Sequence, residues 1–267
     1  MKWTGRITSK EFWDANAADI DHLDDLSRGT DPLICRIMEI LQHYLPNGHG
    51  KTFFEVGCYP GRFLAMFSKR MGYLVSGIDY TDKAMLLPEQ LRKIGVNGSE
   101  ILINDFFKLV TEKQYDVVGS FGFIEHFTEP EDVINRHTAL VHPGGYLVIG
   151  VPNLNNPIHK IISRKLLSYH YLGIMDCDRI SDYVRRAGFE VIFSDYIINF
   201  PVNLKRNIYL RDNLFTFIKI IYFKIMTILL KMASFFKDKS VMERKIIKKW
   251  FPGYILCIAR KNIVPNI

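Results

Sequence analysis

The sequence predicts an α/β protein whose single sheet is doubly wound, mostly parallel and seven-stranded, with helices on both faces. Short apolar runs alternate with amphipathic stretches from Thr52 to Val151, a pattern typical of consecutive βα units. A glycine-containing turn follows the first of these runs, where this kind of fold often binds a ligand. The length of 267 residues suits one large domain with additions.

Seven segments have the composition of strands. Five near-continuous apolar runs predict central strands buried on both faces, because parallel strands are covered by helices on each side. These runs span residues 51–57, 73–79, 100–105, 115–121 and 146–151. A helix that ends near Gly188 leads into a sixth strand, and residues 253–261 predict the last one.

Three helical stretches connect the first five strands. They span residues 61–71, 81–95 and 129–141, and each has apolar side chains at helical spacing. Pro88 lacks a backbone N–H, so it should kink the second stretch or split it in two. The sequence His-Pro-Gly-Gly at 142–145 should end the third stretch.

This pattern divides the chain into three parts. Residues 1–50 predict an N-terminal helical cap, in which the stretch 30–45 is amphipathic. The core comprises residues 51–196 and 253–263, and residues 197–252 predict a basic, amphipathic helical insertion before the last strand. The insertion is strongly apolar, but lysines at 219, 224 and 231 interrupt it. A membrane-spanning helix needs about 20 mostly apolar residues with few charges.

The positive charge is confined to the C-terminal part of the chain. Residues 1–204 contain 21 Lys and Arg against 25 Asp and Glu, whereas residues 205–267 contain 14 against 3. A helix with a wide apolar face and flanking lysines can lie on an anionic membrane surface. Residues 205–249 therefore predict either peripheral membrane binding or a helical cover or homodimer face. Nucleic-acid binding is disfavoured because no recognition motif accompanies the lysines.

The cysteines and the first residues favour a cytoplasmic protein. The four cysteines, at 35, 58, 177 and 257, form no CxxC pair, which argues against a zinc site or a disulfide framework. The first residues lack the apolar segment and cleavage site of a secretory signal. We expect a cytoplasmic location, with peripheral contact to a membrane as the alternative.

The strongest functional signal lies at the first strand-to-helix turn, where the sequence of residues 53–61 is FFEVGCYPG. Gly57 and Gly61 permit a tight loop whose backbone can approach a ligand closely. Asp79 closes the second strand about 20 residues later, where a carboxylate can accept both hydroxyls of a ribose. The glycine spacing lacks the G-x-G-x-x-G form that binds a pyrophosphate, which disfavours a nicotinamide dehydrogenase.

With these motifs the chain resembles the class I S-adenosylmethionine-dependent methyltransferases, which are Rossmann-like enzymes, and in particular the branch of the ubiquinone-biosynthesis O-methyltransferases. The resemblance is close from Thr52 to Asn153 and loose over the last two strands. Besides Asp79, it rests on the glycine motif at 55–61, Asn-Asp-Phe at 104–106, residues 121–127 and Pro-Gly-Gly at 143–145.

The resemblance implies that S-adenosylmethionine is the cofactor and lies across the carboxyl ends of the strands. Gly57 and Gly61 would lie against its methionine and ribose portions, and Asp79 would bind the ribose. Asp105 would accept a hydrogen bond from the adenine amino group, with Phe106 nearby. The full set of expected cofactor-binding residues is Glu55, Gly57, Tyr59, Gly61, Asp79, Asp105, Phe106, Phe121 and Glu125.

Tyr59 departs from the family, which usually has a third glycine at this position. If the backbone here requires φ > 0, a tyrosine costs roughly 1–2 kcal/mol. The loop would then either follow another backbone path or place the Tyr59 ring or hydroxyl over the cofactor. This residue suggests an alternative function, in which a fold relative binds the cofactor or a partner without catalysis.

Methyl transfer from a sulfonium requires an acceptor held in line and, for a hydroxyl acceptor, the removal of a proton. His126 is the candidate catalytic base, because it follows the fourth strand at the cofactor end of the sheet. His159 and His170 follow the fifth strand, where they could contact substrate or be solvated loop residues. No pair of histidines or carboxylates has metal-ligand spacing, so no metal is expected.

We expect the methyl acceptor to be an oxygen of a small molecule, a glycan or a lipid-linked intermediate. A nucleic-acid methyltransferase is a further alternative, suggested by the basic charge. Residues 121–127 stand where an amino-directed nucleic-acid methyltransferase would carry Asn/Asp-Pro-Pro-Tyr/Phe, which counts against that alternative.

Overall fold

A computed structural model of the chain describes residues 5–16, 23, 31–156, 159–160, 167–198, 249–250 and 253–263. The chain divides into two compact units, one made of residues 1–199 and 249–267 and the other of residues 200–248. All of the second unit lies outside the described residues, and with it most of the predicted insertion at 197–252 and nearly all of the basic segment at 205–249.

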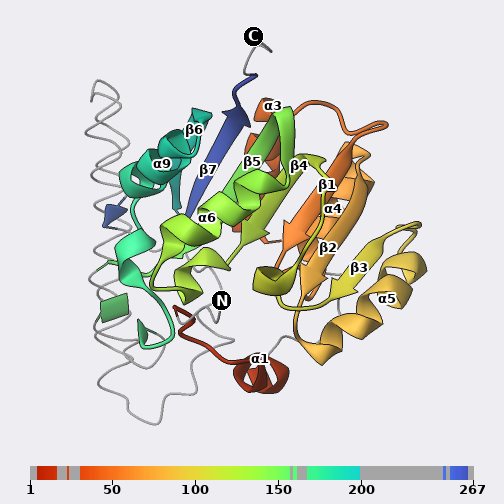
Figure 1. Cartoon of the computed structure of the whole chain (residues 1–267), viewed down its shortest axis with the longest axis horizontal. Coiled ribbons are helices and arrows are strands. Elements are labelled where there is room, and N and C mark those ends of the chain that lie inside the picture. The colour runs from red at the N-terminus through yellow and green to blue at the C-terminus, as the bar shows by residue number, and fades with distance from the viewer. Residues whose placement is uncertain are drawn as a thin grey trace. The chain divides into compact units, whose positions relative to one another are not determined.

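The described part is built on one seven-stranded sheet (Figure 1), as the sequence predicts. In chain order the strands are β1 (Thr52–Val56), β2 (Leu74–Asp79), β3 (Glu100–Ile103), β4 (Tyr115–Phe121), β5 (Val141–Asn153), β6 (Phe189–Ile198) and β7 (Gly253–Lys261). Their order across the sheet is β3-β2-β1-β4-β5-β7-β6. The first five are parallel, and β7 is antiparallel to both β5 and β6.

The strand order reverses at β1. From β1 the chain moves outward to β2 and β3 on one side, then returns to place β4 and β5 on the other side. The connections after β1 and β4 therefore leave the sheet in opposite directions at neighbouring positions. In open α/β sheets this reversal creates a crevice beyond the carboxyl ends of the strands, where ligands bind.

The helices form where the sequence predicts them. They are α1 (Lys10–Asn16), α3 (Pro32–Tyr44), α4 (Arg62–Met71), α5 (Leu87–Lys93), α6 (Pro130–Ala139) and α9 (Cys177–Arg186), and a 3₁₀ turn, Asp82–Leu86, precedes α5. Pro88 lies in the first turn of α5, so the proline splits the predicted stretch 81–95 into two helices. Asp31 caps α3, since its carboxylate accepts a hydrogen bond from the Leu33 N–H at 2.8 Å.

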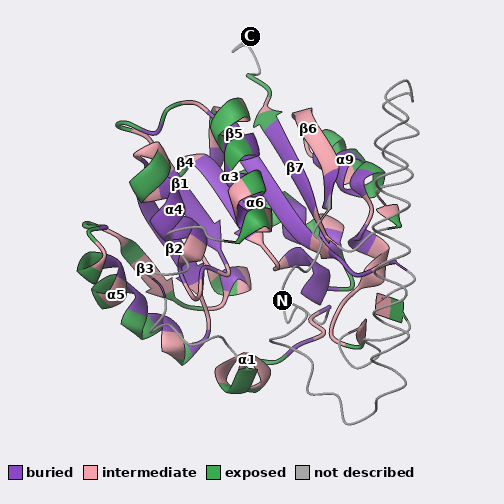
Figure 2. Cartoon of the chain, turned by 180° about the vertical axis from the view of Figure 1, so that it is seen from behind, coloured by how far each residue is buried: buried purple, intermediate pink, exposed green. Residues whose placement is uncertain are grey.

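Two apolar clusters cover the two faces of the sheet. Neighbouring strand residues point to opposite faces, so Phe53 and Val117 belong to one cluster and Phe54 and Val118 to the other. The first cluster also contains side chains from α3, α4 and α5, and the second contains side chains from α6 and α9. The central strands are buried along most of their length (Figure 2), which explains why their sequences are apolar rather than alternating.

One boundary differs from the expectation. The stretch 142–145 follows the end of α6, as predicted, but it is part of β5, which already begins at Val141. Tyr115 pairs with Val141 and Val117 pairs with Tyr146, so residues 142–145 form an irregular bulge opposite Asp116. Among the described residues no helix is long and apolar enough to cross a membrane.

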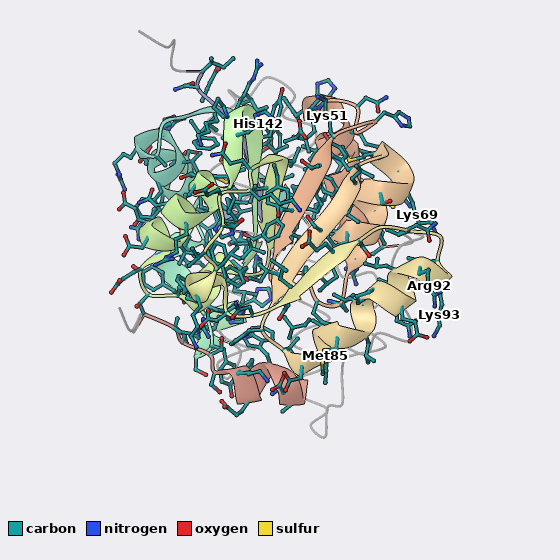
Figure 3. The ribbon with its side chains drawn as sticks, turned by 45° about the vertical axis from the view of Figure 1, so that its right-hand side comes forward. Lys51, Lys69, Met85, Arg92, Lys93 and His142 are labelled. Atoms are coloured by element: carbon teal, nitrogen blue, oxygen red, sulfur yellow. The ribbon has the colours of Figure 1, made fainter. Side chains whose placement is uncertain are left out.

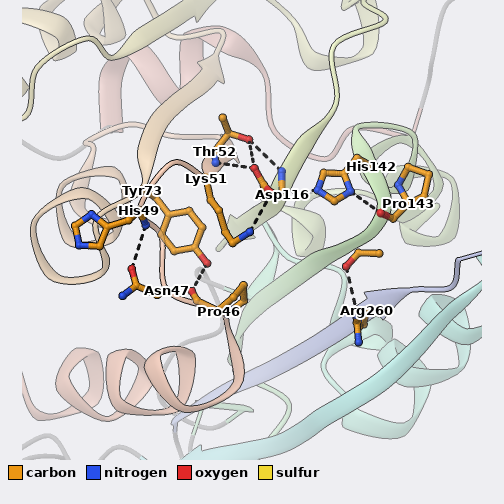
Figure 4. Close-up of polar contacts among 11 residues, drawn as sticks. Pro46, Asn47, His49, Lys51, Thr52, Tyr73, Asp116, His142, Pro143 and Arg260 are labelled. Atoms are coloured by element: carbon orange, nitrogen blue, oxygen red, sulfur yellow. Dashed lines mark hydrogen bonds and ion pairs between the residues drawn. The ribbon is translucent and has the colours of Figure 1, made fainter.

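Asp116 joins three strands at the end of the sheet opposite the crevice (Figure 4). Its carboxylate accepts hydrogen bonds from the Thr52 N–H at 2.8 Å and the Thr52 hydroxyl at 2.9 Å, and contacts the His142 Nε2 at 3.1 Å. Lys51 and His142 lie together at this end of the sheet, away from α1 (Figure 3). Burial opposes ionisation of Asp116, but the hydrogen bonds from Thr52 and His142 outweigh it and lower the pKa of the carboxyl.

Replacing Asp116 with alanine should lower the free energy of unfolding by about 1–3 kcal/mol at neutral pH, because it leaves the Thr52 N–H without its charged acceptor. Since the pKa of Asp116 is lower in the folded state, its contribution should be lost as the pH falls through that value. Urea denaturation of Asp116→Ala and wild type across acidic pH measures this difference. The exposed Asp182, which pairs with Arg185 in the same helix, gives the control Asp182→Ala. Equal stability of Asp116→Ala and wild type at neutral pH would contradict the assignment.

Candidate functional site

The loop between β1 and α4 owes its path to two glycines. Gly57 has φ 72° and Gly61 has φ 89°, a backbone region that other residues rarely adopt. A Cβ atom on Gly57 would lie 2.6 Å from the ring of Phe123, which follows β4. The absence of a side chain at 57 therefore lets the loops after β1 and β4 approach each other across the crevice.

Tyr59 does not carry the strain that a glycine-like position would impose. Among the described residues, positive φ values occur only at glycines, and in this loop they occur at Gly57 and Gly61. The condition under which Tyr59 would cost roughly 1–2 kcal/mol, a positive φ, is therefore not met. The loop follows another backbone path, in which the Tyr59 N–H donates a hydrogen bond to Asp79 Oδ2 at 3.0 Å.

Asp79 connects the ends of β1 and β2. Besides the bond from Tyr59, its Oδ1 accepts a hydrogen bond from the Thr81 N–H at 3.0 Å. Burial raises the pKa of the Asp79 carboxyl, and the hydrogen bonds from Thr81 and Tyr59 oppose this shift. The same carboxylate lines the cavity described below, so two backbone donors fix its orientation there.

The end of β3 supplies a second acidic residue. Asp105 Oδ1 accepts hydrogen bonds from the Phe107 N–H at 3.0 Å and from an Arg6 guanidinium nitrogen at 2.7 Å. The Arg6 guanidinium carbon lies 4.6 Å from the centre of the Tyr80 ring, within range of a cation–π contact. The N-terminal segment therefore pairs with a residue that the sequence assigns to cofactor binding.

A cavity of about 280 Å³ opens at the carboxyl ends of β1 to β4. It is far larger than the roughly 30 Å³ that one water molecule occupies in the liquid, so it can hold an organic ligand. Seven of the ten predicted site residues line it, namely Gly57, Tyr59, Asp79, Asp105, Phe106, Phe121 and His126. The structure thus brings together residues from four separate strand ends, as predicted.

The other three predicted residues do not line the cavity. Glu55 is 3% exposed and accepts a hydrogen bond from the backbone N–H of Leu64 in the first turn of α4, so it links the end of β1 to the start of α4. Burial raises its pKa well above the ordinary value. Gly61 precedes α4, and a Cβ there would lie 2.5 Å from Leu87. Glu125, in the 3₁₀ turn Ile124–His126 after β4, is 1% exposed.

Part of the cavity wall comes from residues that sequence reasoning missed. The N-terminal segment 5–16 contributes Arg6, Thr8, Trp13 and Asn16. The backbone holds it in place, because the Ile7 N–H donates to the His126 carbonyl at 2.9 Å and the Thr128 N–H donates to the Gly5 carbonyl at 2.8 Å. No motif marks these residues, since their position depends on pairing with a loop more than 100 residues away.

The predicted base His126 lies on the cavity wall and is 6% exposed. Its Nδ1 lies 2.8 Å from the Tyr169 carbonyl oxygen, which can only accept a hydrogen bond, so Nδ1 carries the proton and Nε2 has a free lone pair. Burial, with a smaller effect from His170, lowers the pKa of His126 to about 4. The imidazole is therefore neutral at physiological pH.

Glu125 and His170 lie beside His126. Glu125 Oε1 is 3.9 Å from His126 Nε2, and the His126 and His170 rings are 4.6 Å apart between centres. Burial raises the pKa of Glu125 to about 8, because the low-dielectric interior disfavours its charged form. His159 lies elsewhere and contacts the side chain of Asn156.

Residues 31–196 match the model of a protein family that is described as a methyltransferase domain. This region contains the first five strands and all ten predicted site residues.

Ubiquinone biosynthesis O-methyltransferases are among the curated relatives. The protein of Klebsiella pneumoniae (strain 342) is 32% identical over 112 residues, which cover 40% of this chain and 44% of the relative. The protein of Azoarcus sp. (strain BH72) is 26% identical over 154 residues, which cover 54% of this chain and 66% of the relative. The chain thus matches 44% and 66% of the length of these two relatives.

Solved structures share the fold at low sequence identity. Geranyl diphosphate C-methyltransferase from Streptomyces coelicolor A3(2) superposes with a TM-score of 0.59 at 14% identity, covering 94% of this chain and 96% of that one. Phosphoethanolamine N-methyltransferase 2 from Haemonchus contortus, in complex with S-adenosyl-L-methionine, gives a TM-score of 0.58 at 15% identity, covering 96% and 60%. Likeness at this level supports the fold alone.

The family match spans the first five strands, the glycine loop and most of the cavity wall, and the strand order and structural neighbours agree with it. The chain belongs to the family of class I S-adenosylmethionine-dependent methyltransferases.

Proposed function

We propose that this protein transfers a methyl group from S-adenosylmethionine to an oxygen of a small molecule, a glycan or a lipid-linked acceptor. The observation that carries the proposal is the cavity at the carboxyl ends of β1 to β4, in which carboxylates and aromatic rings surround the glycine loop. The O-methyltransferase relatives support oxygen as the acceptor atom over the part of the chain that they match.

The cavity residues fit the chemistry of this cofactor. Asp79 presents a carboxylate, already oriented by two backbone N–H groups, that can accept hydrogen bonds from ribose hydroxyls. Asp105 can accept a hydrogen bond from the adenine amino group beside its contact with Arg6. Aromatic side chains suit both the flat purine and the positively charged sulfonium. Those in the wall are Trp13, Tyr59, Tyr80, Phe106, Phe121, Phe123 and Phe127.

The methyl group of the cofactor is already activated, so the protein needs to align the acceptor and exclude water. The acceptor oxygen forms its bond to the methyl carbon as the carbon–sulfur bond breaks, and the sulfur keeps the electron pair. His126 Nε2 can hold a hydrogen bond from an acceptor hydroxyl in the cavity. Its low pKa makes it a weak proton acceptor, so we expect it to orient the hydroxyl more than to remove its proton.

A non-catalytic fold relative is less well supported than the sequence alone suggests. That alternative depended on strain at Tyr59, and the Tyr59 backbone has no positive φ. The nucleic-acid alternative depended on the basic charge at 205–267, most of which lies outside the described residues. Neither alternative has a described feature in its favour.

Isothermal titration of the purified protein with S-adenosylmethionine and with its product S-adenosylhomocysteine tests the donor site. Production of S-adenosylhomocysteine in the presence of phenolic, glycan or polyprenyl-linked acceptors, followed by mass spectrometry of the methylated product, then identifies the acceptor atom. Failure of both cofactor forms to bind would overturn the proposal.

The variant Asp79→Asn should bind both cofactor forms about 10- to 100-fold more weakly, because hydrogen bonds to a charged acceptor contribute roughly 1.5–3 kcal/mol. Asparagine keeps an acceptor oxygen for the Tyr59 or Thr81 N–H, so the fold should persist. The control Asp182→Asn, on the exposed side of α9, should bind like wild type. Unchanged affinity of Asp79→Asn in calorimetry would remove Asp79 from the ribose site.

The variant Tyr59→Gly should gain neither stability nor affinity. Because Tyr59 does not have positive φ, glycine relieves no strain there, and its greater freedom in the unfolded chain should cost about 0.5–1 kcal/mol. Thermal unfolding and cofactor titration measure both effects. A more stable variant, or one with tighter cofactor binding, would show instead that Tyr59 obstructs the site.

A further inference from the structure

Three side chains with metal-binding atoms converge beside the cavity wall. Glu125 and His126 follow β4, and His170 comes from the segment after β5. One ligand atom from each residue lies within 4.8 Å of those of the other two. We propose that Glu125, His126 and His170 bind a divalent transition-metal ion.

The backbone holds the two parts of this cluster together on both sides of His170. The Tyr171 N–H donates a hydrogen bond to the Glu125 carbonyl at 2.6 Å, and the Tyr169 carbonyl lies 2.8 Å from His126 Nδ1. His170 stands between these two anchor points. Its position opposite Glu125 and His126 is therefore set by the fold, as a metal site requires.

His126 has the hydrogen bonding of a metal ligand. Its Nδ1 donates to the Tyr169 carbonyl, which fixes the ring and leaves the Nε2 lone pair for an ion. In metal sites the second ring nitrogen of a ligating histidine almost always makes such a bond. The Trp13 and His126 rings pack nearly perpendicular to each other, with 4.9 Å between their centres, and this contact further restricts the imidazole.

Glu125 supplies a buried oxygen that needs a partner. The side chain is 1% exposed, and its Oε2 has no hydrogen-bond partner among the described residues. A buried polar atom without a partner costs about 1–3 kcal/mol. Glu125 Oε1 lies 3.9 Å from His126 Nε2, so a cation between Glu125 and the two imidazoles would give this buried carboxyl group a charged partner and favour its ionised form.

The ligand set selects the class of ion. Two imidazoles and one carboxylate suit Zn²⁺, Mn²⁺, Fe²⁺ or Co²⁺, whereas Mg²⁺ and Ca²⁺ prefer oxygen ligands throughout. With bonds of about 2.1 Å, ligand atoms in a tetrahedral site lie roughly 3.4 Å apart. Rotations that move the side-chain ends by about 1 Å would close the present cluster around an ion.

Three protein ligands leave coordination positions open, and His126 places the ion at the cavity wall. Resting on the proposed function, we infer that the ion coordinates the acceptor oxygen. A coordinated hydroxyl has a lower pKa, so its proton can leave to water before the oxygen attacks the methyl carbon. With the ion bound, His126 Nε2 is a ligand, and the ion instead of this nitrogen holds the acceptor oxygen.

The inference departs from the expectation that no metal binds. That expectation considered spacing along the chain, and the third ligand lies 44 residues after His126. Hydrogen bonds between the loops after β4 and β5 help to bring His170 to the other two.

Titration of the tag-free, metal-stripped full chain with Co²⁺ alone tests the site, by calorimetry and by the visible absorption of bound Co²⁺. Wild type should bind one ion, and Zn²⁺ should displace it. His170→Ala and Glu125→Gln should each weaken Co²⁺ binding at least tenfold. Glutamine keeps the shape of the buried side chain, so Glu125→Gln removes the charge with little change in packing.

The exposed His49, in the loop before β1, gives the matched control His49→Ala, which should bind Co²⁺ like wild type. Absence of Co²⁺ binding, or equal binding by wild type and both ligand variants, would overturn the site. Cofactor titration of His170→Ala without metal separates the two proposals. If Co²⁺ binds but S-adenosylmethionine does not, the metal site stands and the proposed function fails.

Discussion

The reversal of strand order at β1 is the constraint on which the candidate site depends. β1 pairs with β2 on one side and with β4 on the other, so the chain leaves β1 and β4 in diverging directions. The loops after β1 and β4 border the crevice and approach each other closely. Gly57 makes this possible, since any Cβ there would meet Phe123 at 2.6 Å.

Two acidic residues that line the cavity, Asp79 and Asp105, also accept hydrogen bonds from the backbone of the surrounding loops. Asp79 binds two N–H groups, from Tyr59 and Thr81, and Asp105 binds the Phe107 N–H. Glu55 interacts with the first turn of α4 from inside the protein. The loops are therefore positioned before any ligand arrives, and little reorganisation is needed to present the carboxylates.

The two sides of the cavity have different origins in the chain. The side assigned to the cofactor is built by turns that directly follow β1, β2 and β3, within a short stretch of sequence. The side beside His126 is completed by the N-terminal segment 5–16 and by residues 169–171, which attach to the loop after β4 through backbone hydrogen bonds. The proposed acceptor and metal sites therefore depend on contacts between distant segments.

The sequence by itself determined the sheet, its crossover helices and the carboxyl-end positions of Asp79 and Asp105. These follow from local patterns, because apolar runs and glycine turns fix strands and their ends without reference to distant residues. Pro88 likewise splits its helix for a purely local reason.

Only the tertiary structure decided the path of the loop at Tyr59, the pairing of Arg6 with Asp105 and the meeting of His170 with Glu125 and His126. It also showed that Glu55 and Glu125 are buried and do not line the cavity. Each of these features depends on packing or hydrogen bonds between segments far apart in the chain, and no local pattern of residue types encodes such contacts.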